Sequence, residues 1–388
     1  KWIGMEYPMI CFNGGRPEAD GTYSERTKYG MWGVIIHEVG HNFFPMIINS
    51  DERQWTWMDE GLNTFVQYLT EQEWERGYPS RRGPAYMIAD YMRGDTDYIS
   101  PIMTNSESIW QFGNNAYGKP ATALNILRET IMGRELFDYA FKKYCERWAF
   151  KHPTPADFFR TMEDASAVDL DWFWRAWFFT TDHVDISLDE VNWYELNTMN
   201  PEVEKAADKE RDDNADVFVG DSRNKESVKE TVNERDSDID DFYAKRDIYA
   251  VDALDRKDYE EFKEGLSEEE LVLLNSGKQF YELKFTNKGG IPMPLILRFT
   301  FNDGSNEVVR IPVEIWRRSE ESVSKVFMFD KEVDAIRLDP FLETADTDLN
   351  NNSWPEERQP TRYELFKQKN NGENPMQRDK RVKELEGQ

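Results

Sequence analysis

The chain has 388 residues, 39% of them hydrophobic, and its 24 Phe, 17 Tyr and 13 Trp are enough to build a core in two or three domains. Its net charge of −27 excludes nucleic acid as a partner, because the phosphate backbone would be repelled. No window reaches the length of a transmembrane helix, and two cysteines, Cys11 and Cys145, cannot form a disulfide framework.

Residues 1–195 have the pattern of a mainly helical domain. A helix start is indicated at Thr154, where the side chain can cap, Pro155 suits the first turn and Asp157 favours the positive end of the helix. The aromatic run at 170–179 is too apolar for an exposed helix and is expected to be core. Apolar residues recur at helical spacing in the windows 27–44, 58–77, 119–133, 134–150 and 152–166.

The pattern changes after residue 195. Residues 199–245 are rich in charge and nearly free of large apolar side chains, which is typical of a solvated excursion. Residues 256–275 recover some helical pattern. We therefore predict an acidic linker with some helix over 196–277.

Within the region 278–350 the apolar residues alternate with a period of two from about residue 279 to 342, which predicts strands. The turn Asp303-Gly304 indicates a hairpin, and we expect a small antiparallel β-sandwich here, followed by a polar tail over 351–388. The alternating residues of the predicted hairpin are Leu295, Leu297, Phe299 and Phe301 before the turn and Val309, Ile311, Val313 and Ile315 after it.

Two of the four histidines, His37 and His41, lie four positions apart, and Glu38 follows the first. On a helix these positions share one face, so both imidazoles can reach one ion. This HExxH pattern is typical of a zinc hydrolase, in which the glutamate faces the water on the ion. The other histidines, His152 and His183, have no ligand spacing and are expected to be structural or solvent-facing.

A hydrolytic zinc site needs a third protein ligand and an open position. Glu60, in the segment WMDEGLNTF, is the main candidate, because a helix–loop–helix hairpin would fold it back over the ion. Asp59 is the alternative, either as the ligand itself or as a group that fixes an imidazole.

Three motifs lie within the first 127 residues of the chain. The HExxH motif precedes Glu60 in a DEG context, GMEYP lies at 4–8, and NAYGKPATALNIL lies at 115–127. Together they resemble the gluzincin zinc aminopeptidases of the aminopeptidase N type, whose GAMEN and catalytic-tyrosine segments correspond to the last two. The resemblance covers roughly residues 1–190 and, more weakly, the strands at 279–342.

The resemblance implies an α+β multidomain fold, with a thermolysin-like, mainly helical catalytic domain over 1–195 and a small antiparallel β-sandwich behind it. It also implies one zinc ion held by His37, His41 and Glu60, with Glu38 as the general base. Zinc lowers the pKa of its water to about 7, and the glutamate would take that proton and pass it to the leaving amine.

The remaining implied roles concern the substrate. Tyr117 would stabilise the oxyanion, and Glu6 would bind the free α-amine of a peptide, which distinguishes an exopeptidase from an endopeptidase. Gly4 and Met5 would lend backbone groups to the bound peptide. The implied partner is therefore a peptide with a free amino terminus.

The chain departs from the family pattern in several places. Tyr7 stands where the family usually has Asn, Asp59 stands where Asn is common, and HNFFP replaces the usual HQWFG at the second ligand. The family's large N-terminal β-domain is not in this chain. We expect the chain to be a piece of a longer protein whose N-terminal β-domain completes the cleft.

The sequence thus predicts a zinc metallopeptidase that removes amino-terminal residues. One alternative is a gluzincin endopeptidase, which Tyr7 would favour if it spoils the amine site. The other is a non-catalytic binding or scaffold module that uses the acidic 199–245 segment and the β-sandwich as partner surfaces. The complete set of ligand and base residues counts against the scaffold.

Overall fold

The computed structural model describes residues 4–236, 238–357 and 372–387, which form two compact units. The first comprises the described parts of Lys1–Val191, Leu283–Lys325 and Val333–Gln388, and the second those of Asn192–Glu282 and Val326–Glu332. Residues 1–3 of the predicted catalytic domain and 358–371 of the predicted tail lie outside the described residues. The predicted domain boundaries stay a prediction.

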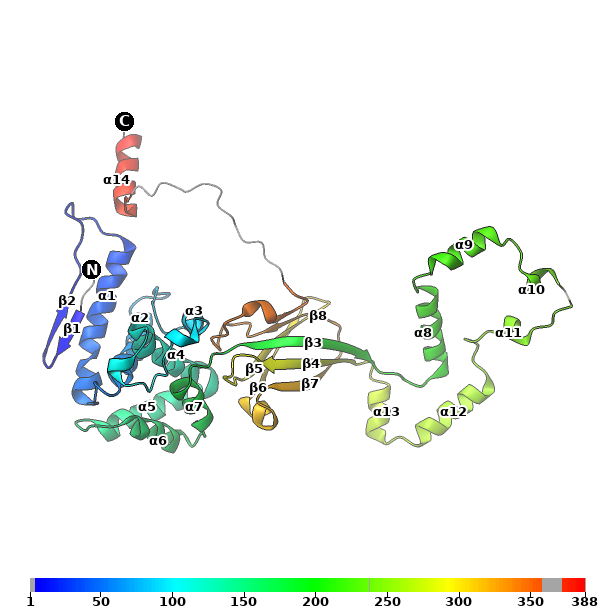
Figure 1. Ribbon diagram of the computed structural model, residues 1–388, viewed down its shortest axis with the longest axis horizontal. Coiled ribbons are helices and arrows are strands. Elements are labelled where there is room, and N and C mark those ends of the chain that lie inside the picture. The colour runs from blue at the N-terminus through cyan, green and yellow to red at the C-terminus, as the bar shows by residue number, and fades with distance from the viewer. Residues whose placement is uncertain (1–3, 237, 358–371, 388) are drawn as a thin grey trace. The chain divides into compact units, whose positions relative to one another are not determined.

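The first unit opens with an antiparallel hairpin that lies against a long helix (Figure 1). Ser24 begins this helix by accepting a hydrogen bond from the amide of Thr27, which satisfies one free amide of its first turn. The elements of this part are β1 (Gly4–Tyr7), β2 (Ile10–Asn13), α1 (Glu25–Gly40), α2 (Leu62–Trp74), α3 (Ala89–Met92), α4 (Lys119–Ile126), α5 (Arg134–Trp148), α6 (Pro155–Ser166) and α7 (Asp171–Phe179).

Two expectations for this region are confirmed. Helix α6 begins with a capping box in which Thr154 and Asp157 satisfy each other's backbone amides, and Pro155 lies in the first turn. Most of the aromatic run of α7 is core, since Trp174 and Trp177 are at most 3% exposed, whereas Phe179 at its end is 52% exposed. The indole of Trp57, itself buried, packs on Phe158 and Phe178, so this aromatic core supports the segment that carries Glu60.

The strands form two larger sheets, with the orders β3–β4–β7 and β6–β5–β8–β9. The pairs β5–β6, β5–β8 and β8–β9 are antiparallel. The fold is therefore mixed helix and antiparallel sheet, as predicted, whereas the sandwich arrangement stays a prediction. The strands are β3 (Ile186–Glu195), β4 (Gln279–Asn287), β5 (Leu295–Phe301), β6 (Asn306–Ile311), β7 (Ser322–Phe329), β8 (Val333–Leu338) and β9 (Ser353–Trp354).

The predicted hairpin is confirmed up to Ile311 and wrong beyond it. Strands β5 and β6 flank the turn, where Gly304 has a φ of 78° that a β-carbon would strain. Residues Val313–Arg318 form a 3₁₀-helix rather than a strand, so Val313 and Ile315 do not continue the alternation. Pro312 explains the error, because it lacks the amide that the ladder needs.

The predicted acidic linker, residues 196–277, carries several helices, drawn in green to yellow-green in Figure 1. Lys205 of α8 pairs with Asp255 of α12 at 2.5 Å, and Arg256 of α12 pairs with Glu202 at 2.8 Å, so charge pairs rather than an apolar core hold these two helices together. The helices are α8 (Pro201–Asp213), α9 (Val219–Ser227), α10 (Val232–Arg235), α11 (Phe242–Lys245), α12 (Ala253–Glu264) and α13 (Glu268–Leu274); α14 (Pro375–Glu386) lies near the C-terminus.

A membrane crossing finds no support in the described residues. Among them, no helix combines the length and the apolar character that a bilayer span requires.

Candidate metal centre

Helix α1 brings the two histidines together at its C-terminal end. His37 lies in the last turn and His41 directly follows Gly40, one turn further on. Their Nε2 atoms are 3.1 Å apart, and the rings are nearly perpendicular at 87°. Both imidazoles therefore point one nitrogen at the same small volume.

Glu60 reaches this volume from the short helix η2 (Trp57–Gly61), which leads into α2. Its Oε2 atom lies 3.1 Å from His37 Nε2 and 3.4 Å from His41 Nε2. The three potential ligand atoms thus lie together as the sequence predicts, and Glu60 is turned toward the pair.

The spacing of these atoms tests whether a zinc ion fits. Ligand atoms about 2.0–2.1 Å from a tetrahedral zinc ion lie roughly 3.3–3.4 Å from one another. The three separations here, 3.1, 3.1 and 3.4 Å, are close to the edges of such a tetrahedron. Two imidazoles and one carboxylate are also a donor set that zinc accepts, so the residues present fit this ion.

The Nδ1 atoms of both imidazoles form hydrogen bonds that leave the Nε2 atoms facing the cluster. His37 Nδ1 donates to the Gln67 side-chain oxygen at 2.9 Å, and His41 Nδ1 donates to the Phe44 carbonyl at 2.8 Å. Asp59 Oδ1 also lies 3.0 Å from His41 Nδ1. With Nδ1 protonated, Nε2 presents its lone pair. The position of Asp59 is that of a group that fixes an imidazole.

The base candidate Glu38 is buried beside the two histidines. Glu38 is 6% exposed, and its Oε2 atom has no hydrogen-bond partner among the described residues. Burial raises the pKa of Glu38, because the charged form loses water. A buried carboxylate oxygen with free acceptor capacity, next to the proposed ligands, is suited to accept a proton from a water molecule.

Tyr117 lies in the short helix η6 (Gly113–Gly118), which precedes α4, and contacts the Glu60 oxygen that the two histidines do not face. Its hydroxyl donates to Glu60 Oε1 at 2.5 Å, and its ring stacks on His37 with centroids 5.8 Å apart. Burial, and then the Glu60 carboxylate, raise the pKa of Tyr117. The phenol therefore stays protonated and available as a donor. Burial opposes ionisation of Glu60, but hydrogen bonds from His37, His41 and Tyr117 lower its pKa to about 2.

Hairpin β1–β2 adds a second carboxylate at the edge of the cluster. Glu6 Oε2 lies 3.9 Å from His41 Nε2, and Glu6, Glu38 and His41 form a second group of potential ligand atoms that shares His41 with the first. One imidazole nitrogen serves one ion, and the first group has the two histidines that zinc favours. Tyr7 follows Glu6 on the strand and therefore points to the other face, where its ring packs on Phe12.

Comparisons with known proteins locate a family domain over this cluster. Residues 15–177 match the model of the Peptidase family M1 domain. We call this matched region the M1 domain. It contains the HExxH helix, Glu60 and Tyr117, and the GMEYP hairpin lies just before it.

Relatives of the M1 domain are moderately similar and much longer. A glutamyl aminopeptidase of Bos taurus is 24% identical over 156 residues, which is 39% of this chain and 16% of that protein. A probable aminopeptidase 1 of Sulfurisphaera tokodaii is 24% identical over 43% of this chain and 22% of that protein. The chain therefore spans about a fifth of the length of these relatives. The crystal structure of a Legionella pneumophila aminopeptidase A aligns with a TM-score of 0.47 and 14% identity, over 84% of this chain and 27% of that chain.

The other two histidines lie apart from the cluster of the M1 domain. His152 Nδ1 bonds to the Asn49 side chain at 2.8 Å, and His183 forms a backbone bridge with Gly290. Among the described residues, neither belongs to a group that could hold a metal.

Sequence reasoning missed two contacts of His37. Gln67 holds its Nδ1, and Asn63 donates to its backbone carbonyl at 2.9 Å. A signal for Gln67 was available, because it lies seven positions after Glu60, two turns along the same helical face. For Asn63 the sequence offers no comparable signal.

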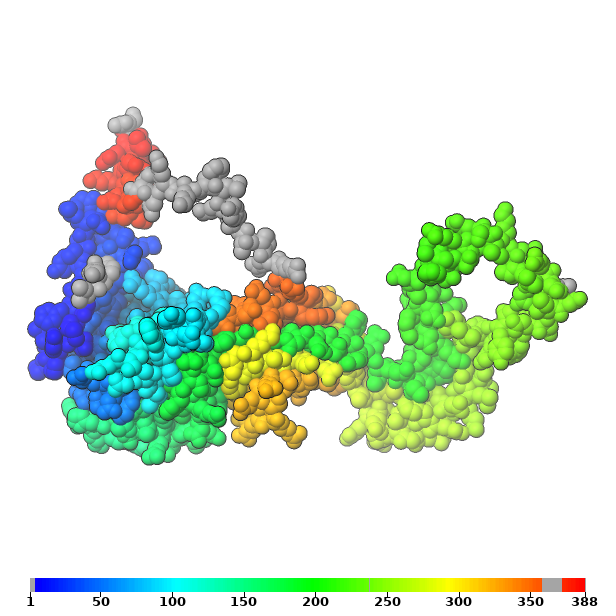
Figure 2. Space-filling view, in the orientation of Figure 1, coloured from blue at the N-terminus to red at the C-terminus, as the bar shows by residue number. Residues whose placement is uncertain are grey.

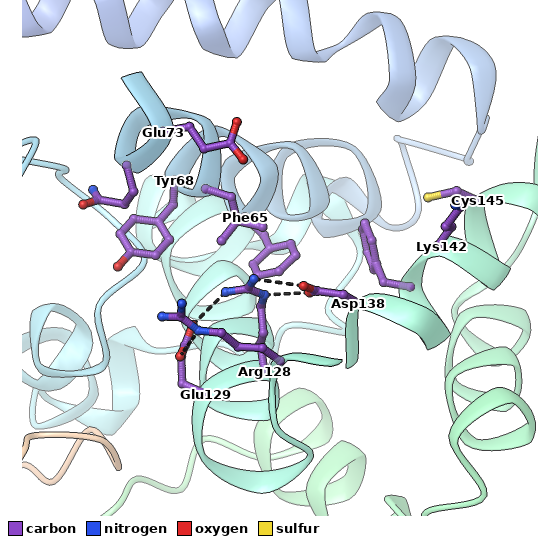
Figure 3. A pocket seen from close by; sticks show the side chains of 12 residues that line it. Phe65, Tyr68, Glu73, Arg128, Glu129, Asp138, Lys142 and Cys145 are labelled. Carbon is purple, nitrogen blue, oxygen red and sulfur yellow. Dashed lines mark hydrogen bonds and ion pairs between the residues drawn. The ribbon is translucent and has the colours of Figure 1, made fainter. Parts of the chain in front are cut away.

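A hollow of about 590 Å³ lies elsewhere in the M1 domain, between α2, α5 and the short helix η7 (Leu127–Ile131) (Figure 3). Arg128 donates to both carboxylate oxygens of Asp138, at 2.6 and 2.9 Å. Burial raises the pKa of Cys145 to about 12, so the thiol stays protonated. This hollow therefore presents neither an unpaired Arg128 nor a reactive thiol, and none of the zinc candidates lines it.

Gly4 gives a test of how tightly Glu38 is held. A methyl group at Gly4 would lie 1.9 Å from Glu38 Oε1, so Gly4→Ala must displace the carboxylate. We expect kcat to fall by roughly 10²-fold, as a displacement near 1 Å can cause, while the melting temperature changes little because the carboxylate ends a flexible side chain. Steady-state kinetics and thermal unfolding measure both. Gly265→Ala, where the new methyl would make only ordinary contacts, is the control; unchanged kinetics in Gly4→Ala would contradict the prediction.

Proposed function

We propose that this chain is the catalytic part of a zinc-dependent peptidase that removes amino-terminal residues from peptides. One observation carries the proposal: His37, His41 and Glu60 converge on a point at zinc-like spacings, beside a Glu38 oxygen, Oε2, that has no hydrogen-bond partner among the described residues. The M1 domain supports the same conclusion.

His37, His41 and Glu60 would hold one zinc ion and leave one position open. When bound there, zinc supplies an acidified water molecule and polarises a carbonyl group. The outer contacts from Gln67 and Asp59 would keep the imidazoles in the ligating tautomer.

Glu38 and Tyr117 would carry the proton transfer and the charge stabilisation. Glu38 accepts a proton from the attacking water and delivers it to the nitrogen of the leaving amine. The Tyr117 hydroxyl, released from Glu60, donates a hydrogen bond to the carbonyl oxygen of the substrate as that oxygen becomes negative. The phenol has the protonation state that this needs near neutral pH, because burial and the Glu60 carboxylate keep it neutral.

Glu6 would select the amino terminus of the substrate. Its carboxylate lies on the His41 side of the cluster, and an α-ammonium group there would be held by an opposite charge in a partly buried site. The backbone of Gly4 and Met5 would contact the peptide beside it. Hairpin β1–β2 has only two strands and exposes large apolar side chains such as Met9 and Phe12, and it lies on the surface of its unit (Figure 2, dark blue). The N-terminal β-domain of the full-length protein would complete the cleft here.

Acetylation of the substrate tests this role of Glu6. Peptides with a free amine are expected to be cleaved at least roughly tenfold faster, in kcat/KM, than the same peptides with an acetylated amine, and Glu6→Gln should remove most of this preference. Mass spectrometry of the products measures both rates and identifies the bond that is cut.

Three results of this experiment would separate the alternatives. Equal rates on free and acetylated peptides, with internal cuts, would identify an endopeptidase. Zinc-loaded protein that cuts neither peptide would identify a binding module. Retention of the full preference in Glu6→Gln would exclude Glu6 as the anchor.

A further inference from the structure

Arg82 lies beside the metal centre and has no role in the function proposed above. It follows α2 in the loop before the 3₁₀-helix at Ala85–Ile88. Its guanidinium carbon lies 4.4 Å from the centroid of the Tyr117 ring. It also lies against Gly113, where an added methyl group would come within 3.4 Å of Arg82 Nη2. The guanidinium is thus packed between the aromatic face and the backbone of η6, with part of the side chain still accessible.

No side chain in the part of the chain that the structure describes pairs directly with the Arg82 guanidinium. Among the described residues, no hydrogen bond or ion pair involves its guanidinium, whereas Arg128 is bonded to two carboxylates. Burial lowers the pKa of Arg82 because its surroundings disfavour the charged form. A partly buried guanidinium with five unused donors is costly unless an anion pairs with it. The stacking of the guanidinium on the Tyr117 ring offsets only part of this cost of burial.

The position of Arg82 along the site suggests what that anion is. Contacts run in order from Glu6 to His41, then to Glu60 and Tyr117, and end at Arg82. In the proposed function the amine lies at the first of these residues and the scissile carbonyl at Tyr117. Arg82 therefore lies beyond the carbonyl, on the side of the leaving amine.

We propose that Arg82 binds a carboxylate of the peptide substrate, on the leaving-amine side of the scissile bond. Arg82 is then a residue that determines substrate specificity. This inference rests on the proposed function. The planar guanidinium pairs with a carboxylate through two parallel hydrogen bonds. Glu6 and Glu38 would repel a substrate carboxylate, and in the proposed function the open position at zinc serves the scissile bond, so the guanidinium is the favourable place for the carboxylate. Two sources share this chemistry: the C-terminal carboxylate of a dipeptide and an acidic side chain directly after the cut.

Binding calorimetry tests the proposal without relying on turnover. The probes are alanyl-alanine, alanyl-alanine amide and alanyl-aspartyl amide, each titrated into zinc-loaded Glu38→Gln protein with and without Arg82→Gln. Arg81→Gln serves as the matched control, because Arg81 is the exposed neighbour. We expect a probe with the correct carboxylate to lose roughly tenfold to hundredfold in affinity in Arg82→Gln, whereas the plain amide changes by less than about threefold.

The three probes also distinguish the two sources of the carboxylate from each other, and they distinguish carboxylate binding from a role of Arg82 in positioning Tyr117. Loss confined to alanyl-alanine assigns the C-terminal carboxylate, and loss on alanyl-aspartyl amide assigns the acidic side chain. The proposal would be overturned if protein that retains Arg82 bound the two carboxylate probes no more tightly than alanyl-alanine amide. It would also be overturned if Arg82→Gln weakened the binding of all three probes equally, and Arg82 would then be a positioning residue for Tyr117. Hydrolysis of an alanyl-coumarylamide, which carries no carboxylate, reports separately on the proposed function, so failure of one does not imply failure of the other.

Discussion

Glu38→Gln removes turnover and leaves zinc in place. The glutamine keeps the shape of the side chain but cannot take a proton from water, so kcat should fall by roughly 10²–10⁴-fold, the contribution of a general base. The proposed zinc ligands should stay in place, because the hydrogen bonds that hold His37 and His41 at Nδ1 come from Gln67 and Phe44 and not from Glu38. Steady-state kinetics on a coumarylamide, with zinc content measured by mass spectrometry of the metal, checks both parts.

Glu25→Gln is the matched control for this change. It replaces another carboxylate of the same helix, exposed in the first turn, and should change kcat by less than about twofold. Hydrolysis at the wild-type rate in Glu38→Gln would refute the mechanism, and loss of zinc would mean that Glu38 is itself a ligand.

Glu60→Ala should release the metal. The change removes one of the three proposed protein ligands and the carboxylate that lies nearest both Nε2 atoms, so zinc affinity should fall well beyond the roughly 10–100-fold that losing an outer hydrogen-bond partner costs. Gln67→Ala, which removes only the bond to His37 Nδ1, provides that smaller reference in the same protein. Competition with a chromophoric zinc chelator ranks the two variants against wild type.

Asp59→Ala decides between the neighbouring carboxylates. With Asp59 placed at the far nitrogen of His41, its loss should resemble the loss of Gln67 rather than that of Glu60. If Asp59→Ala lost zinc while Glu60→Ala kept it, the assignment of the third ligand would be reversed.

The grouping of His37, His41 and Glu60 could be predicted from the sequence, because these residues lie close together along the chain. His37 and His41 are one helical turn apart, and Glu60 lies at the start of the next long helix, so spacing along the chain translates directly into spacing in three dimensions. The helix start at Thr154 and the aromatic core of α7 were predictable for the same reason.

What the sequence did not reveal depends on contacts between distant segments. The approach of Gly4 to Glu38 joins a hairpin to a helix 34 positions away, and no periodicity encodes it. Arg82 lies in a loop without a repeating pattern, so its stacking on Tyr117 becomes visible only in three dimensions. The error at Val313 has a different cause, since Pro312 was present in the sequence and outweighs the alternation of apolar residues.

Anomalous diffraction at the zinc absorption edge, from crystals of the zinc-loaded protein, tests the central claim most directly. We expect one peak, about 2.0–2.2 Å from His37 Nε2, His41 Nε2 and a Glu60 carboxylate oxygen, with no fourth side chain in contact. A peak away from these three atoms, or a fourth protein ligand that closes the open position, would contradict it.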